Sequence, residues 1–193
     1  MVVLGLGNPG ERYERTRHNV GARVVETLVG RWKARPGESA PEYRAWVAAP
    51  GGRSAALLRT KVYMNESGAA LAAWGARHPF EVAELLVVAD DVYLPVGMVR
   101  VRPGGGTGGH RGLESVGETL GTLEFARLRI GVGAVASEAL REHVLDEFGE
   151  AEETELTAAV TEAADAVECW IGEGVLAAMN RFNRRVRKED LET

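Results

Sequence analysis

The sequence contains only one cysteine, Cys169, among its 193 residues. A single thiol cannot form an internal disulfide, which excludes a small disulfide-stabilised scaffold and favours a reducing compartment. The sequence also lacks an apolar run of the ~20 residues that a membrane span requires. Its first residues lack the charged start and apolar middle of a signal peptide. We therefore predict a cytoplasmic protein in which Cys169 is a buried helix residue.

Common signatures of metal and phosphate sites are missing as well. The four histidines form no H-x-x-x-H pair and there is no C-x-x-C pair, so we predict no metal site. No serine lies in a G-x-S-x-G turn, and no glycine run continues into the G-K-[S/T] of a P-loop. These absences argue against metal-dependent, serine-hydrolase and P-loop chemistry.

The stretch 5–10, GLGNPG, fits the dinucleotide pattern G-x-G-x-x-G. In a dinucleotide-binding fold the helix begins within the glycine motif, and its N-terminus faces the pyrophosphate. Here the polar stretch ERYERTRHN follows, and the apolar stripe of a helix begins only near Val20. We therefore predict that this loop is not a dinucleotide site, with a nicotinamide enzyme as an alternative interpretation.

The net charge of −5 argues against a uniformly basic nucleic-acid binder, although association depends on local patches. The charges are segregated, because residues 146–168 contain many acidic residues and no lysine or arginine. Basic residues gather in the glycine-rich middle and near the C-terminus, namely Arg100, Arg102, Arg111, Arg127 and Arg129, and Arg181, Arg184, Arg185, Arg187 and Lys188. Ordinary solvated surface charge is the alternative interpretation of both groups.

Strand-like apolar runs alternate with helix-like stripes along the chain. Strands are expected at residues 2–6, 45–49, 54–59, 84–90, 97–102 and 126–133, and loops at 33–44 and 103–109. Helices are expected from Val20, from about residue 66, and over an acidic stretch whose apolar stripe runs from Leu156 to Ile171. The alternation predicts an α/β fold with a mixed, largely parallel twisted sheet and helices on both faces. We expect a single catalytic domain over residues 1–193, with a basic tail from about residue 181.

Polar side chains are expected to gather at one edge of this sheet. Asn8 follows the first strand, Asn65 precedes a helix, and Asp90 and Asp91 end the strand 84–90. The carboxyl ends of parallel strands meet at the ligand crevice of open α/β sheets. His18 belongs to the same crossover as Asn8, and a carboxylate near it would fix its tautomer and stabilise the imidazolium. Two amides, a histidine and a carboxylate suit the binding of an amide-containing substrate and the activation of water.

The remaining histidines have different surroundings. His110 ends the run GGGTGGH, where glycines permit tight backbone curvature and close approach of a ligand. His78 and His143 lie among polar or charged residues. We expect both at the surface.

Five stretches together resemble the bacterial peptidyl-tRNA hydrolases, namely GLGNPGERYERTRHNVG, VYMNESG, VVADDVYLP, GGGTGGHRGLES and RLRIGVG. They occur in the order and spacing of that family, over about residues 1–182. The resemblance implies one α/β domain without a cofactor that hydrolyses the ester between a peptide and its tRNA. Such enzymes recycle tRNA from peptidyl-tRNA that ribosomes release prematurely. A non-catalytic RNA-binding protein on the same fold is the alternative.

The resemblance also implies roles for single residues. His18 would be the general base that activates water, and Asp90 would hold it in its basic, oriented form. Asn8 would help to distinguish N-blocked substrates from free aminoacyl-tRNA, and Asn65 would hydrogen-bond the peptide backbone. Further substrate contacts are implied for Tyr13, Tyr63, Met64, His110 and Arg111.

A tRNA partner would give the basic residues a function. The acidic helix would face away from the RNA. Phosphates of the acceptor stem would bind four arginines, namely Arg100, Arg102, Arg127 and Arg129. We expect a monomer that binds peptidyl-tRNA at its acceptor stem and 3′ end.

The chain departs from the family in a few places. Arg111 stands where asparagine is usual. Asparagine can both donate and accept a hydrogen bond and so can order a water molecule, whereas arginine can only donate. Arg111 would instead bind a phosphate or stack on a base. Tyr93 stands where an acidic residue is common, and Lys61 and Val62 replace small polar residues. We expect these last changes to be peripheral to the chemistry.

Overall fold

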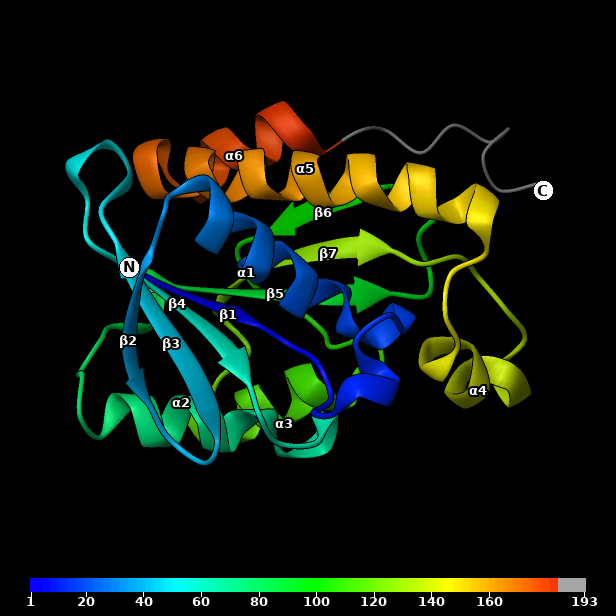
Figure 1. The fold of residues 1–193 in the computed structure, drawn as a ribbon, viewed down its shortest axis with the longest axis horizontal. Coiled ribbons are helices and arrows are strands. Elements are labelled where there is room, and N and C mark those ends of the chain that lie inside the picture. The colour runs from blue at the N-terminus through cyan, green and yellow to red at the C-terminus, as the bar shows by residue number, and fades with distance from the viewer. Residues whose placement is uncertain (184–193) are drawn as a thin grey trace.

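The computed structural model describes residues 1–183, which are built around one seven-stranded sheet (Figure 1). The strand order is β2-β3-β4-β1-β5-β7-β6. The strands are β1 (Val2–Gly5), β2 (Arg35–Ser39), β3 (Tyr43–Ala48), β4 (Ala55–Thr60), β5 (Leu85–Asp91), β6 (Val99–Arg102) and β7 (Ala126–Gly131). The central strands β4, β1, β5 and β7 are parallel, whereas β2, β3 and β6 join in antiparallel pairs. The predicted mixed sheet is confirmed.

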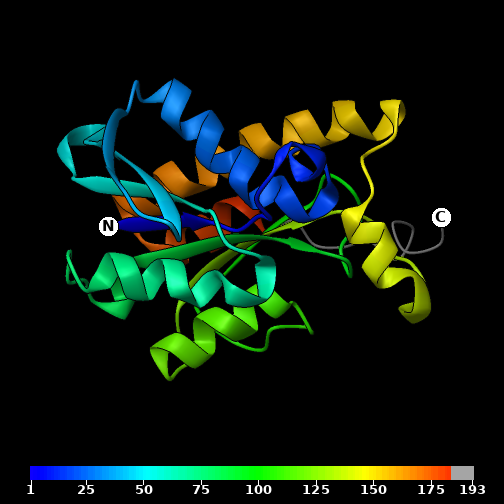
Figure 2. The ribbon, with the colours of Figure 1, turned by 60° about the horizontal axis from the view of Figure 1, so that its bottom comes forward.

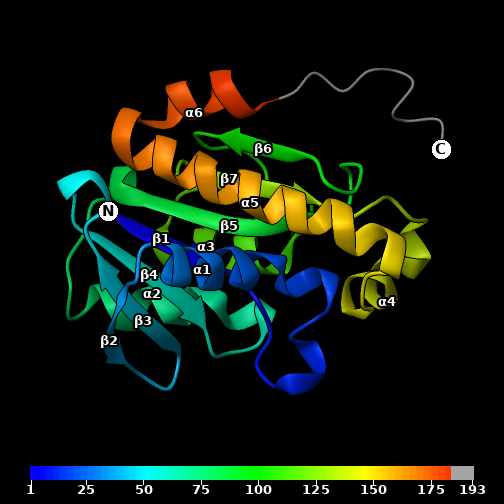
Figure 3. The same ribbon diagram turned by 45° about the horizontal axis from the view of Figure 1, so that its top comes forward.

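Helices cover both faces of the sheet, as predicted (Figure 2). One face carries α1 (Val20–Arg31), α5 (Glu150–Glu173) and α6 (Val175–Phe182), and the other carries α2 (Ser67–Gly75) and α3 (Arg111–Leu120). The helix α4 (Leu140–Leu145) lies beyond the end of the sheet toward which β5 and β7 run (Figure 3). Among the helices of residues 1–183, none combines the length and the apolar character of a membrane span.

The central strand β5 shows why the sheet forms. All of its residues, from Leu85 to Asp91, are buried. Its apolar side chains point alternately into two clusters, one beneath α1, α5 and α6 and the other beneath α2 and α3. A parallel strand that is covered on both faces requires an unbroken apolar run, and LLVVA provides it. The same burial makes the carboxylates of Asp90 and Asp91 costly unless they find partners.

The segments predicted as a loop (33–44) and as a basic tail (from about residue 181) have different outcomes. The loop predicted over residues 33–44 is wrong for Arg35–Ser39, which form the edge strand β2, and for Tyr43 and Arg44, where β3 begins. Pro36 is tolerated there because β2 pairs only with β3 and has a bulge between Pro36 and Ser39. Most of the expected basic tail, with Arg184, Arg185, Arg187 and Lys188, lies outside the described residues.

The glycines of GLGNPG allow α1 to pack very closely on the sheet. A Cβ atom on Gly5 would lie 2.4 Å from the carbonyl oxygen of Gly21, and one on Gly21 would lie 2.3 Å from the carbonyl oxygen of Val88. Two 3₁₀ helices, η1 (Glu11–Tyr13) and η2 (Arg17–Asn19), separate the motif from α1. Packing of helix against strand therefore accounts for Gly5, whereas Gly10 has a φ angle of 99° and a Cβ atom on it would meet nothing within 4 Å.

The acidic helix α5 is matched by basic residues of α1. Arg23 contacts Glu153 at 2.5 Å, and Arg31 contacts Asp165 at 2.6 Å. Pairs at the surface, exposed or partly exposed, each contribute little free energy. Together they neutralise part of the negative charge of residues 146–168. Cys169 is buried in the same helix, as predicted, and burial raises the pKa of its thiol.

Candidate active site

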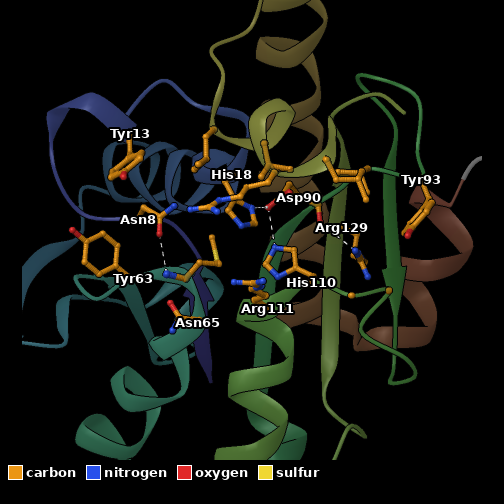
Figure 4. A pocket seen from close by; sticks show the side chains of 18 of the residues that line it. Asn8, Tyr13, His18, Tyr63, Asn65, Asp90, Tyr93, His110, Arg111 and Arg129 are labelled. Atoms are coloured by element: carbon orange, nitrogen blue, oxygen red, sulfur yellow. Dashed lines mark hydrogen bonds and ion pairs between the residues drawn. The ribbon is translucent and has the colours of Figure 1, made fainter. Parts of the chain in front are cut away.

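An open cavity of about 500 Å³ lies at the carboxyl edge of the parallel strands (Figure 4). The neighbouring strands β1 and β4 lead into helices on opposite faces, so their connecting segments diverge and leave a crevice. The segments after β1, β4 and β5, the residues before α3, and α4 all contribute to its wall. The residues predicted for catalysis or substrate contact all line it, namely Asn8, Tyr13, His18, Tyr63, Met64, Asn65, Asp90, His110 and Arg111.

His18 is held by the carboxylate at the end of β5. Its Nδ1 atom lies 2.7 Å from Oδ1 of Asp90, which confirms the predicted contact. Since an ionised carboxylate can only accept, Nδ1 carries a proton, so in the neutral imidazole the lone pair lies on Nε2. The His18 side chain is 14% exposed and lines the cavity. A neutral imidazole of this kind is a base that a water molecule in the cavity can reach.

His110 donates a second hydrogen bond to the same oxygen atom. Its Nε2 lies 2.9 Å from Oδ1 of Asp90, and its Nδ1 accepts from the backbone N–H groups of Gly112 and Leu113 at 3.1 and 3.3 Å. These bonds cap the N-terminus of α3. Because an accepting Nδ1 carries no proton, His110 is neutral and its Nε2 is the donor. One carboxylate oxygen thus orients two imidazole rings whose centroids are 4.9 Å apart.

Asp90 remains ionised although its side chain is only 2% exposed. Burial by itself would raise the pKa of this carboxyl. The neighbouring His18 and His110 outweigh burial and hold the pKa of Asp90 well below its usual range. A fixed negative charge beside His18 stabilises the imidazolium that forms when Nε2 takes up a proton.

The donor atoms of His18, Asp90 and His110 lie within 4.8 Å of one another, a spacing that also suits a metal ion. The hydrogen bonds favour a different use of these atoms. His18 Nδ1 and His110 Nε2 carry protons toward Asp90, and His110 cannot move its proton to Nδ1 without losing two backbone donors. The arrangement suits proton transfer better than metal coordination.

Asn8 is a buried residue in the wall of the same cavity. Its backbone N–H donates to Asn19 Oδ1 at 2.8 Å, and its carbonyl accepts from Asn19 Nδ2 at 2.9 Å. Its side-chain Oδ1 accepts from the backbone N–H of Met64 at 2.9 Å, which orients the amide because only the oxygen can accept. The NH₂ group has no partner within residues 1–183 and is free to donate to a substrate.

Sequence reasoning missed the contribution of Asn19. An asparagine directly before an apolar helical stripe is read as an N-cap, yet Asn19 makes no capping hydrogen bond to α1. Its amide instead ties the Asn8 segment to the 3₁₀ helix that carries His18. No pattern in the sequence distinguishes this use from an ordinary cap.

Arg17 anchors the His18 segment from the other side and was also missed. Its Nη1 donates to the carbonyl of Glu147 at 2.6 Å, and its Nη2 contacts Glu152 at 2.7 Å. Its guanidinium also lies 4.8 Å from the centre of the Phe148 ring. These contacts attach η2 to the segment that leads into α5.

The predicted peptide-contacting residues lie beside Asn8 (Figure 4). Met64 is buried beneath this end of the cavity, and Asn65 is exposed in the 3₁₀ helix Met64–Glu66, just before α2. Tyr63 is 51% exposed. Tyr13 lies in η1, where Arg12 stacks on its ring. This end of the cavity therefore offers amide groups and aromatic rings without a buried charge.

Arg111 is the first residue of α3 and lies next to His110. It is exposed, lines the cavity and makes no hydrogen bond or ion pair within the described residues. Its guanidinium is therefore available to a bound substrate.

The four arginines predicted to meet tRNA phosphates share one face of the sheet, because Arg100 pairs with Arg129 and Arg102 with Arg127 across β6 and β7. Their surroundings differ. Arg102 is exposed and Arg100 is half-buried, and neither has a partner within residues 1–183. Arg129 lines the cavity, and its Nε lies 3.0 Å from Asp91 Oδ2 as an ion pair.

The expectation is wrong for Arg127, which is buried. Its N–H groups are directed at backbone carbonyl oxygens of four residues, namely Gly105, Gly106, Leu123 and Phe125. Burial lowers the pKa of this guanidinium. Arg127 stabilises the turn of the glycine-rich loop from within and offers no free donor to a phosphate.

One of the two histidines expected at the surface behaves differently. His143 is half-buried, and its Nε2 lies 2.9 Å from the carbonyl oxygen of Val132 and 3.1 Å from that of Gly133. It fastens α4 to the end of β7. His78 is 43% exposed and stacks on Trp74, in line with the expectation.

Comparison with known proteins gives a consistent result. The family model described as Peptidyl-tRNA hydrolase matches residues 2–190. A peptidyl-tRNA hydrolase of Syntrophomonas wolfei is 43% identical over 184 residues, covering 94% of this chain and 99% of its own length. One of Chloroflexus aggregans is 42% identical, covering 94% and 98%. The crystal structure of the peptidyl-tRNA hydrolase from Acinetobacter baumannii superposes with a TM-score of 0.88 at 30% identity, covering 94% of this chain and 93% of that one.

Proposed function

Because the chain belongs to the peptidyl-tRNA hydrolase family, and thus acts on the ester bond of peptidyl-tRNA, we propose that His18 is the general base of this hydrolysis. The observation that carries the proposal is the hydrogen bond from His18 Nδ1 to Asp90, which puts the lone pair of the neutral imidazole on Nε2, at the cavity. General-base assistance of this kind contributes about 10²–10⁴-fold to rate.

The chemistry follows from this arrangement. His18 Nε2 takes a proton from water as the water oxygen attacks the ester carbonyl carbon, and the carbonyl electron pair moves to oxygen. The resulting oxyanion accepts a hydrogen bond from the free NH₂ group of Asn8. Collapse of the intermediate expels the ribose oxygen of the tRNA, which takes a proton from the His18 imidazolium. The products are a peptide carboxylic acid and a tRNA with a free terminal hydroxyl.

The remaining wall residues position the substrate. Asn65, Tyr13 and Tyr63, with Met64 beneath them, contact the peptide beside the ester. Asn8 also favours N-blocked substrates, because it lies between the catalytic group and this peptide end. His110 holds the Asp90 carboxylate and is a positioning residue. Arg111, next to His110, meets the 3′-terminal part of the tRNA.

The tRNA backbone meets the surface formed by β6. Arg100 and Arg102 point from this edge strand and have no partner within residues 1–183. Phosphate contacts of this kind fix position without reading sequence, which suits an enzyme that accepts many tRNAs. One chain supplies every group named for catalysis, which supports a monomer. Its substrate arises from translation in the cytoplasm.

The test uses N-acetylaminoacyl-tRNA as substrate, with wild-type protein, His18→Ala and the matched control His78→Ala. His78 is an exposed histidine that pairs with Glu38 outside the cavity. We expect His18→Ala to lower kcat/KM by about 10²–10⁴-fold and His78→Ala to leave it unchanged. Unblocked aminoacyl-tRNA should be hydrolysed much more slowly by the wild-type protein.

A His18→Ala variant with wild-type kcat/KM would refute the general-base assignment. A wild-type protein that shifts peptidyl-tRNA in a gel but leaves the ester intact would favour the RNA-binding alternative.

A further inference from the structure

Tyr93 is an exposed aromatic residue at the end of the cavity opposite Asn8. Its side chain is 63% exposed, and it lines the cavity at the turn after β5 (Figure 4). The ring hydroxyl makes no hydrogen bond within residues 1–183. A single exposed tyrosine is unremarkable on a protein surface. Whether Tyr93 has a function therefore depends on the contacts that fix its backbone and on the groups near its ring.

Asp91 contacts both the backbone of Tyr93 and the guanidinium group of Arg129. One carboxylate oxygen of Asp91 accepts from the backbone N–H of Tyr93 at 2.9 Å, and the other lies 3.0 Å from Nε of Arg129. Arg129 also donates to the carbonyl of Thr107 at 2.9 Å. The Tyr93 turn is thereby held in a defined position beside the buried ion pair of Asp91 and Arg129.

A stretch without side chains leaves room in front of the ring. Gly108 and Gly109 have φ angles of 63° and 75°, which side chains disfavour. A Cβ atom on Gly108 would lie 3.4 Å from Arg129 Nη1 and 3.6 Å from Tyr93 Cε2, whereas one on Gly109 would meet nothing within 4 Å. A flat group can therefore approach the tyrosine along the glycine backbone.

The two ends of the cavity differ in chemistry, with His18 and Asp90 between them (Figure 4). The Asn8 end carries amides and tyrosines, which suit a peptide. The Tyr93 end combines an aromatic ring with the guanidinium group of Arg129, whereas Arg111 lies nearer the middle of the cavity, beside His110 (Figure 4). Aromatic platforms beside cationic groups are how proteins bind single-stranded nucleic acid.

We propose that Tyr93 is the stacking platform for a base in the single-stranded C-C-A end of the tRNA. This inference rests on the proposed function, since it places the ester between the peptide end and the nucleotide end of the cavity. Tyr93 acts in binding and takes no part in proton transfer. Such a role in binding agrees with the expectation that Tyr93 is peripheral to the chemistry.

The experiment measures binding of a deacylated RNA hairpin, made of an acceptor stem that ends in single-stranded C-C-A, to Tyr93→Ala, Tyr93→Leu and Tyr93→Phe. Because stacking on an aromatic ring is lost, we expect Ala and Leu to raise Kd about 5- to 150-fold. Phe should stay within about twofold of wild type, since it keeps the ring. Leu176→Ala, which removes a 68%-exposed side chain on α6, is the control and should not change Kd.

Two further measurements identify the contact. A hairpin with an abasic residue at the stacked position should bind wild type and Tyr93→Ala equally. The dependence of log K on log salt should keep its slope in Tyr93→Ala, because stacking releases no counterions. Steady-state hydrolysis of the acylated tRNA should show a raised KM with an unchanged kcat.

The inference is overturned if Tyr93→Ala binds the hairpin as wild type does, if Leu replaces Tyr93 as well as Phe does, or if wild-type protein does not bind the hairpin. The hairpin contains no ester, so its binding does not depend on hydrolysis. If the wild-type protein hydrolyses the ester but substitutions at Tyr93 do not change RNA binding, only this inference is refuted. Tyr93-dependent binding without hydrolysis would remove the proposed function instead.

Discussion

At the scale of single residues, the chemistry of the site depends on the two hydrogen bonds that the Asp90 carboxylate accepts. Asp90 Oδ1 receives N–H groups from His18 and His110, and His110 can serve only as a donor because its other nitrogen caps α3. His110 is thus prevented from competing as a base. The lone pair that faces the cavity belongs to His18.

The depressed pKa of Asp90 predicts a pH dependence of stability. A carboxyl whose folded pKa lies below its unfolded value stabilises the fold above the unfolded pKa of about 3.9, and this contribution is lost as pH falls toward the folded pKa. One such group contributes a slope of at most about 1.4 kcal/mol per pH unit. Asp90→Asn should remove this part of the acid dependence, measured as the urea unfolding free energy between neutral and acid pH. Asp165→Asn, an exposed partner of Arg31, is the control and should keep the wild-type slope; equal slopes for wild type and Asp90→Asn would contradict the prediction.

The identities of the site residues could be predicted from the sequence, but the residues that hold them in position could not. Asn8, Asn65 and Asp90 follow strands, and strand ends in a parallel sheet converge, so their meeting needed only the topology. Asn19 and Arg17 act through contacts with residues that no local pattern links to them. The burial of Arg127 was hidden for the same reason, since its partners are backbone carbonyls of a loop whose conformation the sequence does not specify.

At the scale of elements, the close approach of α1 to the sheet sets the position of His18, because η2 leads directly into this helix. The helix contains two glycines with opposite surroundings. A Cβ on Gly21 would lie 2.3 Å from the carbonyl oxygen of Val88, whereas one on Gly30 would meet nothing within 4 Å. The apolar patterns predicted the other six strands and the helices α1, α2 and α5, but not the helices α3, α4 and α6. They did not predict β2 either, because an edge strand can carry Pro36 and a bulge.

These two glycines give a matched pair of variants. Gly21→Ala should destabilise the fold by about 1–3 kcal/mol or more, since backbone atoms must move to admit the methyl group. Hydrolysis should fall with it as η2 is displaced. Gly30→Ala should be neutral or stabilising by up to about 1 kcal/mol, because alanine favours the helix. Chemical denaturation and the N-acetylaminoacyl-tRNA assay measure both effects, and a Gly21→Ala variant as stable as Gly30→Ala would refute the packing explanation.

At the scale of the whole molecule, a chain of net charge −5 must bind a polyanion. Segregation of charge makes this feasible. The arginines of α1 pair with acidic residues of α5 on one face of the sheet, while Arg100 and Arg102 on the edge strand β6 keep their charges unpaired within residues 1–183. Long-range repulsion from the acidic helix is screened over roughly 8–10 Å at physiological salt, so local phosphate contacts decide the affinity.

Binding of tRNA should therefore depend on salt through a few arginines. If Arg102 contacts one phosphate, Arg102→Ala should weaken binding of all tRNAs alike and reduce the slope of log K against log salt by about one. Arg35→Ala is the matched control, because Arg35 is equally exposed but lies on β2, at the opposite edge of the sheet. Filter binding of deacylated tRNA over a salt series measures both slopes. Equal slopes for wild type and Arg102→Ala would show that this edge of the sheet does not meet the RNA backbone, and a reduced slope for Arg35→Ala would locate the contact on the other edge.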